Sequence, residues 1–218
     1  MEFRVHWLSF TIWCDKVYAL KMWEEWFERY LGPMQHQGHG GRGFKGLYKA
    51  LGAAKIYADP VGLLDGNEGY VHFEFPGEAC DALEAKLIQE FIVTLERWEK
   101  FRVSRLDLAW DDVGFTPEDV KQAVEADRIR SLLKRKSLFF GVSPFEERED
   151  GVEGTSSLRL GSLYSARMLR VYDKRGPVRL EFQTREKRAD LLAREILTKL
   201  PSEWAERAIA HLRDYVDF

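Results

Sequence analysis

Hydrophobic and polar residues alternate in a series of short segments along the chain, and each segment predicts a β-strand. Between several of them, apolar residues recur every three or four positions, which predicts amphipathic helices. We expect strands at residues 6–14, 44–50, 54–59, 70–75, 102–112, 136–142, 156–162, 167–174 and 178–185. We expect helices at residues 16–30, 79–101, 117–126, 186–199 and 202–214.

Capping and turn residues mark the ends of these elements. Asp15 precedes the first helix, and Thr116-Pro117 supplies an N-cap followed by a proline at the first helical position. The glycine-rich run QHQGHGGRG at 35–43 predicts a flexible loop, and so its HxxH pair is not expected to bind metal. An acidic loop is expected at 145–154.

The order of elements predicts the α+β class. Neighbouring strands joined by short turns favour a mainly antiparallel sheet, with helices packed on one face and a polar active-site face on the other. We expect residues 1–218 to form one domain, with a possible division into two lobes near 114–135.

Composition limits the protein classes that fit. With 45% hydrophobic and 13% aromatic residues, the 218-residue chain can bury a core. No apolar run reaches the roughly 18 residues of a membrane helix, so we expect a cytoplasmic protein without a membrane partner. The net charge of −3 does not suit a basic coat protein. Arg128 to Arg188 nevertheless carries 15 Lys and Arg against 8 Asp and Glu, which predicts a phosphate-binding surface.

Side-chain alternation separates each strand into an apolar and a polar face. The polar faces of four strands contain carboxylates, arginines, a tyrosine and a lysine. The polar-face residues are His72 and Glu74 in VHFEF, Arg105, Asp107 and Asp111 in RLDLAWDD, Arg170, Tyr172 and Lys174 in LRVYDK, and Arg179, Glu181 and Gln183 in VRLEFQ. On one sheet face these groups would form an active site. The alternative is a set of salt bridges across a solvated sheet.

Carboxylates suit a hard cation such as Mg²⁺ or Mn²⁺, and the candidate ligands are Asp107, Glu181, Asp111 and Glu74. A tyrosine hydroxyl becomes a better nucleophile beside a cation that lowers its pKa, and Tyr172 lies two residues from Lys174. The candidate DNA-binding side chains are Arg105, Arg170, Arg179 and Arg167.

The segments VSRLDLAWDD, SLRLGSLYSARMLRVYDK and VRLEF, with the earlier GYVHFEFPGEAC, resemble the ordered blocks of the replication initiation factor (Rep_trans) family. The resemblance spans roughly residues 44 to 190. Members of this family start rolling-circle replication of plasmids and phages. The resemblance implies an enzyme that nicks one DNA strand, stays joined to the 5′ phosphate through Tyr172 and leaves a 3′ hydroxyl. It also implies origin DNA, single-stranded or in a supercoiled duplex, as the substrate, with a homodimer and a host helicase as possible partners.

Two other functions remain open at this point. A carboxylate-metal nuclease would use water as the nucleophile and Tyr172 only for binding. A DNA-binding regulator derived from such an enzyme would keep the basic surface without turnover. Tyr164 is the rival nucleophile, near a turn at Gly161-Ser162.

Overall fold

The computed structural model describes residues 1–62, 69–97, 100–131, 138–142, 156–162, 164–174 and 176–217. The expected acidic loop at 145–154 lies outside these residues. The chain forms two compact units. Unit 1 comprises Met1–Arg4, Asp107–Thr184 and Ala205–Phe218, and unit 2 comprises Val5–Leu106 and Arg185–Trp204. Strands β1 (Glu2–Ile12) and β6 (Phe101–Asp111) each contribute residues to both units. The number of domains stays a prediction.

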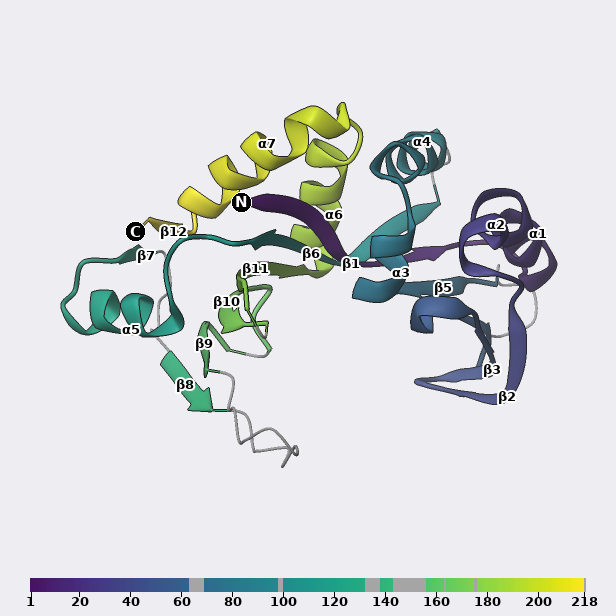
Figure 1. The fold of residues 1–218 in the computed structure, drawn as a ribbon. Coiled ribbons are helices and arrows are strands. Elements are labelled where there is room, and N and C mark those ends of the chain that lie inside the picture. Colours follow the sequence, from purple (N-terminus) through teal and green to yellow (C-terminus); the bar gives the residue numbers. More distant parts are fainter. Residues whose placement is uncertain are drawn as a thin grey trace. The chain divides into compact units, whose positions relative to one another are not determined.

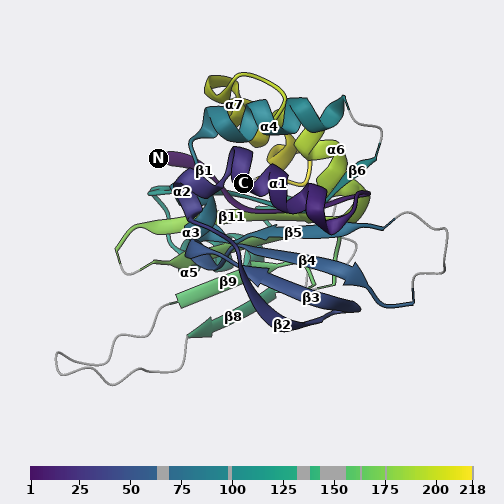
Figure 2. The ribbon, with the colours of Figure 1, turned by 90° about the vertical axis from the view of Figure 1, so that its right-hand side faces the viewer.

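Unit 2 contains a sheet with the strand order β2-β3-β4-β5-β1-β6, and its described registers are antiparallel. Its helices lie together on one side of β3, β4 and β5 (Figure 2). Besides β1 and β6, its elements are α1 (Lys16–Trp26), α2 (Glu28–Leu31), β2 (Gln35–Gly41), β3 (Phe44–Lys49), a 3-10 turn (Leu51–Ala53), β4 (Lys55–Pro60), β5 (Val71–Phe75), α3 (Gly77–Ala82), α4 (Ala85–Glu96) and α6 (Glu186–Ile196).

The core of unit 2 is aromatic. Phe10 of β1 stacks on Phe73 and Phe75 of β5, with ring centroids 4.8 and 5.8 Å apart. Helices α1 and α4 cover this apolar face, since Trp23 lies 5.8 Å from Phe75 and Phe91 lies 5.4 Å from Phe10. Strand alternation therefore sends the polar side chains of β1 and β5 to the opposite face.

Two sequence predictions in unit 2 are wrong. Residues 35–41 form strand β2 rather than a loop, and β2 pairs with β3 through a register shift between His36 and His39. Gly40 permits this close pairing, because a Cβ there would lie 2.5 Å from the carbonyl oxygen of Phe44. The single helix expected at 79–101 is two helices, α3 and α4, because Leu83 and Glu84 adopt extended backbone angles.

Unit 1 contains the strand order β6-β11-β10-β9-β8, and β9 and β10 lie side by side in Figure 1. Thr116 and Asp119 form a capping box at the start of helix α5, as the sequence predicts for the Thr116 cap. Besides part of β6, the elements are α5 (Pro117–Glu125), β7 (Arg130–Ser131), β8 (Leu138–Val142), β9 (Ser156–Leu160), β10 (Arg167–Asp173), β11 (Val178–Arg185), most of α7 (Pro201–Arg213) and β12 (Val216–Asp217), which pairs with β7.

The apolar face of unit 1 is formed by alternate residues of β10 and β11. Leu169, Val171, Leu180 and Phe182 are buried there, and Tyr215, just beyond α7, lies 5.6 Å from Phe182 between ring centroids. The intervening residues of both strands project to a polar face. Antiparallel pairing with helices on the apolar side confirms the α+β class. No helix within the described ranges is both long and apolar enough to cross a membrane.

Candidate active site

The candidate active site lies on the polar face of unit 1, where β10 pairs with β11. The register places Arg170 opposite Glu181 and Tyr172 opposite Arg179. Directly opposed residues in an antiparallel pair have Cβ atoms about 4.5–5.5 Å apart, so the four side chains interact across the strands. The prediction that these residues share one face is therefore confirmed.

The Tyr172 hydroxyl is held by a buried carboxylate. It donates a hydrogen bond to Oε2 of Glu181 at 3.1 Å. The other oxygen of Glu181 pairs with Nη2 of Arg170 at 3.3 Å, and the Arg170 guanidinium lies 5.4 Å from the centre of the Tyr172 ring. The tyrosine is half-buried and Glu181 is buried, so the phenol is oriented before any substrate binds.

Burial and the Glu181 charge raise the pKa of Tyr172 to about 12, although Arg179 opposes the shift. This corrects the expectation that neighbouring cations lower the pKa of Tyr172. Lys174, expected to be one of those cations, is exposed, and its charge helps to lower the pKa of Asp111 instead. The phenol is therefore neutral at physiological pH and needs a base to become a nucleophile.

Arg179 is a second cation beside the tyrosine. Its side chain is 0% exposed and forms a bidentate pair with Asp111, through Nε to Oδ1 at 2.5 Å and Nη2 to Oδ2 at 2.7 Å. Arg179 also donates a hydrogen bond to the hydroxyl oxygen of Tyr172. Hydrogen bonding to Arg179 lowers the pKa of Asp111, so the carboxylate is charged and fixes the guanidinium beside the phenol.

The acidic residues predicted as metal ligands already have other partners. Asp107 is buried and accepts a hydrogen bond from Nε2 of Gln183 at 3.2 Å, while Asp111 and Glu181 pair with arginines. Within the described ranges, no three histidine, cysteine or acidic side chains are arranged to hold a metal ion. Metal dependence stays a prediction, and a cation at these carboxylates would share them with their existing partners or displace those partners.

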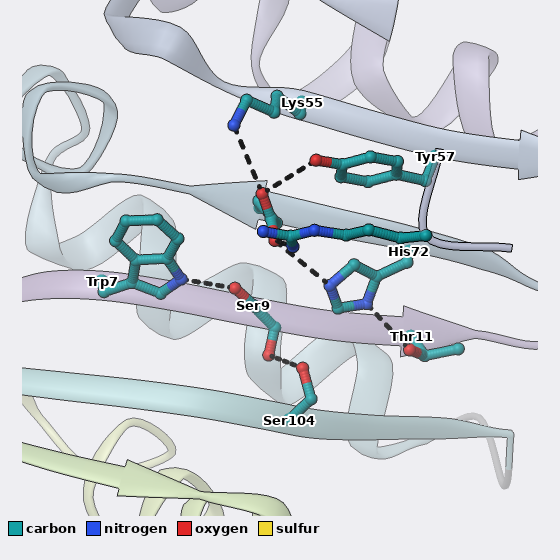
Figure 3. A network of polar contacts seen from close by, with 9 residues as sticks. Trp7, Ser9, Thr11, Lys55, Tyr57, His72 and Ser104 are labelled. Atoms are coloured by element: carbon teal, nitrogen blue, oxygen red, sulfur yellow. Dashed lines mark hydrogen bonds and ion pairs between the residues drawn. The ribbon is translucent and has the colours of Figure 1, made fainter. Parts of the chain in front are cut away.

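Glu74, the fourth predicted ligand, belongs to unit 2, and Figure 3 labels three of its polar neighbours, Lys55, Tyr57 and His72. Its side chain is 4% exposed and pairs with Arg42 and, at 3.6 Å, with Nζ of Lys55. The Tyr57 hydroxyl donates to its Oε2 at 3.3 Å, and Nε2 of His72 lies 3.9 Å from Oε1. Glu74 is thus a buried anion surrounded by cations and a phenol.

Three other predicted residues have surroundings of their own. Arg105 belongs to unit 2, with its guanidinium 4.0 Å from the centre of the Trp7 ring. Arg167 has the strand parity of Leu169, on the apolar face, and lies over the Tyr215 ring at 4.6 Å. The rival nucleophile Tyr164 is 93% exposed on the β9–β10 connection.

Sequence reasoning missed Arg4 and did not select Gln183. Nη2 of Arg4 lies 3.0 Å from Oδ2 of Asp111, and Nη2 of Arg179 donates to the same oxygen. The available signal was the alternation of Phe3, Arg4 and Val5, which extends the first strand toward the N-terminus. Starting that strand at residue 6 left Arg4 outside the predicted sheet.

Comparison with known proteins gives a likeness of fold. No family model matches the chain, and no curated protein matches it. A solved structure of a rolling circle replication initiator protein from Geobacillus stearothermophilus is similar, with a TM-score of 0.72 and 20% sequence identity. The match covers 100% of this chain and 86% of that one. At this identity the likeness shows a shared fold.

Proposed function

We propose that this protein is a rolling-circle replication initiator that nicks and rejoins one DNA strand through a covalent 5′-phosphotyrosine at Tyr172. The observation that carries the proposal is the position of the Tyr172 hydroxyl, between the carboxylate of Glu181 and the guanidinium of Arg179. The fold shared with a rolling circle replication initiator protein supports it. The substrate is origin DNA, presented as a single strand or in a supercoiled duplex.

In the nicking step, the Tyr172 oxygen attacks the scissile phosphorus. A Tyr172 O–P bond forms, and the bond from phosphorus to the 3′ oxygen breaks. Glu181 accepts the hydroxyl proton across the existing 3.1 Å hydrogen bond. That proton ends on the departing 3′ oxygen, which restores the Glu181 carboxylate. The products are a 5′-phosphotyrosine and a free 3′ hydroxyl.

A base is required because the phenol is rarely ionised on its own. With a pKa of about 12, the phenolate fraction at pH 7 is on the order of one in 10⁵. Transfer of the proton to Glu181 during attack avoids forming this rare species first. Glu181 therefore acts as a catalytic base; it lies opposite Arg170 in the cross-strand register, diagonal to Tyr172 and within hydrogen-bond reach of its hydroxyl.

Arg179 and Arg170 supply positive charge next to the reacting oxygen. Arg179 cannot turn away, because Asp111 holds two of its nitrogens. A fixed guanidinium can stabilise the charge that develops on the non-bridging phosphate oxygens without reorganising. Rejoining is the reverse reaction: a 3′ hydroxyl attacks the phosphotyrosine, and Glu181 takes its proton. The phosphotyrosine bond conserves the energy of the broken phosphodiester.

Divalent-metal dependence forms a separate part of the proposal. A bound Mg²⁺ or Mn²⁺ would polarise the phosphodiester. The described carboxylates do not form a ready site, and the proton transfers above are assigned to Glu181 and not to a cation. Asp107 and Glu181 are the acids that a cation would recruit. A homodimer and a recruited helicase remain expectations from the family resemblance.

The test is incubation with 3′-end-labelled single-stranded DNA plus Mn²⁺, with supercoiled plasmid as a second substrate for nicking alone, followed by a denaturing gel. We expect nicked DNA and a protein band that carries the label. Tyr172→Phe should abolish both, and Tyr164→Phe is the matched control that should retain both. Cleavage without a labelled protein band would favour the water-using nuclease, and DNA binding without cleavage would favour the regulator.

A further inference from the structure

The sheet of unit 2 carries a basic face on the side opposite its helices. We define the basic sheet face by five cations on β3, β4, β6 and the β2–β3 turn: Arg42, Lys45, Lys49, Lys55 and Arg105. Unit 2 as a whole contains 17 Lys and Arg against 18 Asp and Glu, a net charge of −1. Positive charge is therefore concentrated on one face of a nearly neutral unit.

The strand registers place these cations together. Lys49 of β3 lies opposite Lys55 of β4, and Lys55 lies opposite Glu74 of β5. Lys45 shares a face with Lys49 because it is four residues earlier on the same strand. Phe73, next to Glu74, is fully buried against the core, which places Glu74 and Lys55 on the face away from the helices.

Among the described residues on these strands, the acids of this face are bound by cations. Glu74 pairs with Arg42 and Lys55, and Asp59 of β4 pairs with Nζ of Lys16 at 2.8 Å. Glu74 is 4% exposed whereas the Arg42 side chain is 63% exposed. The buried anion thus anchors cations that still present their charge to solvent. The result is a surface complementary to a polyanion.

Aromatic rings lie between the cations. The Arg105 guanidinium is 4.0 Å from the centre of the Trp7 ring, and that of Arg42 is 5.5 Å from the Tyr57 ring. Trp7 is half-buried, and its indole N–H donates to Ser9 at 2.5 Å, which fixes the ring on this face (Figure 3). Cations interleaved with aromatic rings suit single-stranded nucleic acid, whose phosphates and bases are both accessible.

We propose that the basic sheet face of unit 2 binds single-stranded DNA, separately from the Tyr172 site of unit 1. This proposal rests on the proposed function, because the single strand that binds here is part of the DNA that Tyr172 nicks. Phosphates contact the lysines and arginines, and bases lie near Trp7. Binding here holds the substrate strand independently of the chemistry at Tyr172.

The test measures binding of a fluorescein-labelled single-stranded oligonucleotide by anisotropy across a salt series. Every variant is made in the full chain carrying Tyr172→Phe, so that no adduct forms. Lys45→Gln with Lys49→Gln removes two exposed cations of the face. We expect affinity near 0.1 M salt to fall on the order of tenfold, and the salt slope to flatten by about 1.4, or about 0.7 for each lost phosphate contact.

The matched control is Lys21→Gln with Lys86→Gln, which removes the same charge from exposed positions on helices α1 and α4 of the same unit. It should leave the salt slope unchanged. An unchanged affinity for the Lys45/Lys49 variant, or an equal loss in the control, would overturn the proposal. A duplex of the same sequence that binds as tightly and loses as much affinity would overturn the assignment to single strands. Failure to nick cannot alter this readout, since binding is measured without chemistry.

Discussion

Replacing Asp111 with leucine should destabilise unit 1 and release Arg179 from its position beside Tyr172. The substitution removes the acceptor of two short hydrogen bonds from a guanidinium that is 0% exposed. Arg4, which pairs with the same carboxylate at 3.0 Å, also loses this partner. The variant therefore leaves a buried positive charge facing a second guanidinium, with no anion between them.

The expected loss follows from that geometry. Removing one partner of a buried ion pair costs about 3–5 kcal/mol. The Asp111 side chain is 11% exposed, so water can reach its edge, and we expect the lower end, about 3 kcal/mol. For a chain of this size, 3 kcal/mol corresponds to a fall in melting temperature of roughly 6–12 °C.

The assay is a double-mutant cycle in urea, followed by circular dichroism at pH 7. Asp111→Leu and Arg179→Met are each measured alone and then together. The double variant removes both charges and keeps apolar volume. Its loss of unfolding free energy should therefore be about 2 kcal/mol smaller than the sum of the losses in the two single variants. If the two losses simply add, Asp111 and Arg179 are not energetically coupled and the bidentate pair does not position the arginine.

Three further predictions concern chemistry and pH. In the Glu181→Gln variant, the nicking rate should rise with hydroxide concentration above neutral pH instead of staying flat, because the neutral amide cannot accept the Tyr172 proton. A flat pH–rate profile in the variant would exclude Glu181 as the base. Nicking should cease in excess chelator and in Asp107→Ala, and full activity in chelator would refute metal dependence. The protein should lose stability relative to Tyr172→Phe as pH rises from 10 to about 12, because the unfolded tyrosine ionises near 10 and the folded one near 12. Parallel stability curves over that range would contradict the raised pKa.

Alternation of side chains predicted much of the sheet. Strands β4, β5, β10 and β11 have clear period-two patterns of β-branched, aromatic or aliphatic residues, and the structure contains all four close to the expected positions. Strand β2 carried no such signal, because QHQGHGG lacks branched and aliphatic residues. Its pairing depends on the neighbouring β3 and on the small size of Gly40, and both are tertiary effects.

The face that carries Tyr172 was predictable, but the partners within it were not. Alternation groups Tyr172 with Arg170 and Lys174 on its own strand, whereas the cross-strand register brings Arg179 and Glu181 to the hydroxyl. Opposed residues on paired strands lie closer than residues two apart on one strand, so the register decides which charges reach Tyr172. Burial, which also depends on the tertiary fold, contributes most to the raised pKa of Tyr172. Asp111 was unpredictable for the same reason. It pairs with Arg4 and Arg179, which lie on two other strands, and the sequence of one strand does not show such a pairing.

The most direct measurement is mass spectrometry of the protein after reaction with single-stranded DNA and nuclease trimming of the adduct. We predict that the peptide containing Tyr172 carries a nucleotide attached through its 5′ phosphate, and that Tyr164 remains unmodified. A nucleotide on another residue, or nicked DNA with no modified peptide, would contradict the assignment of Tyr172 as the nucleophile.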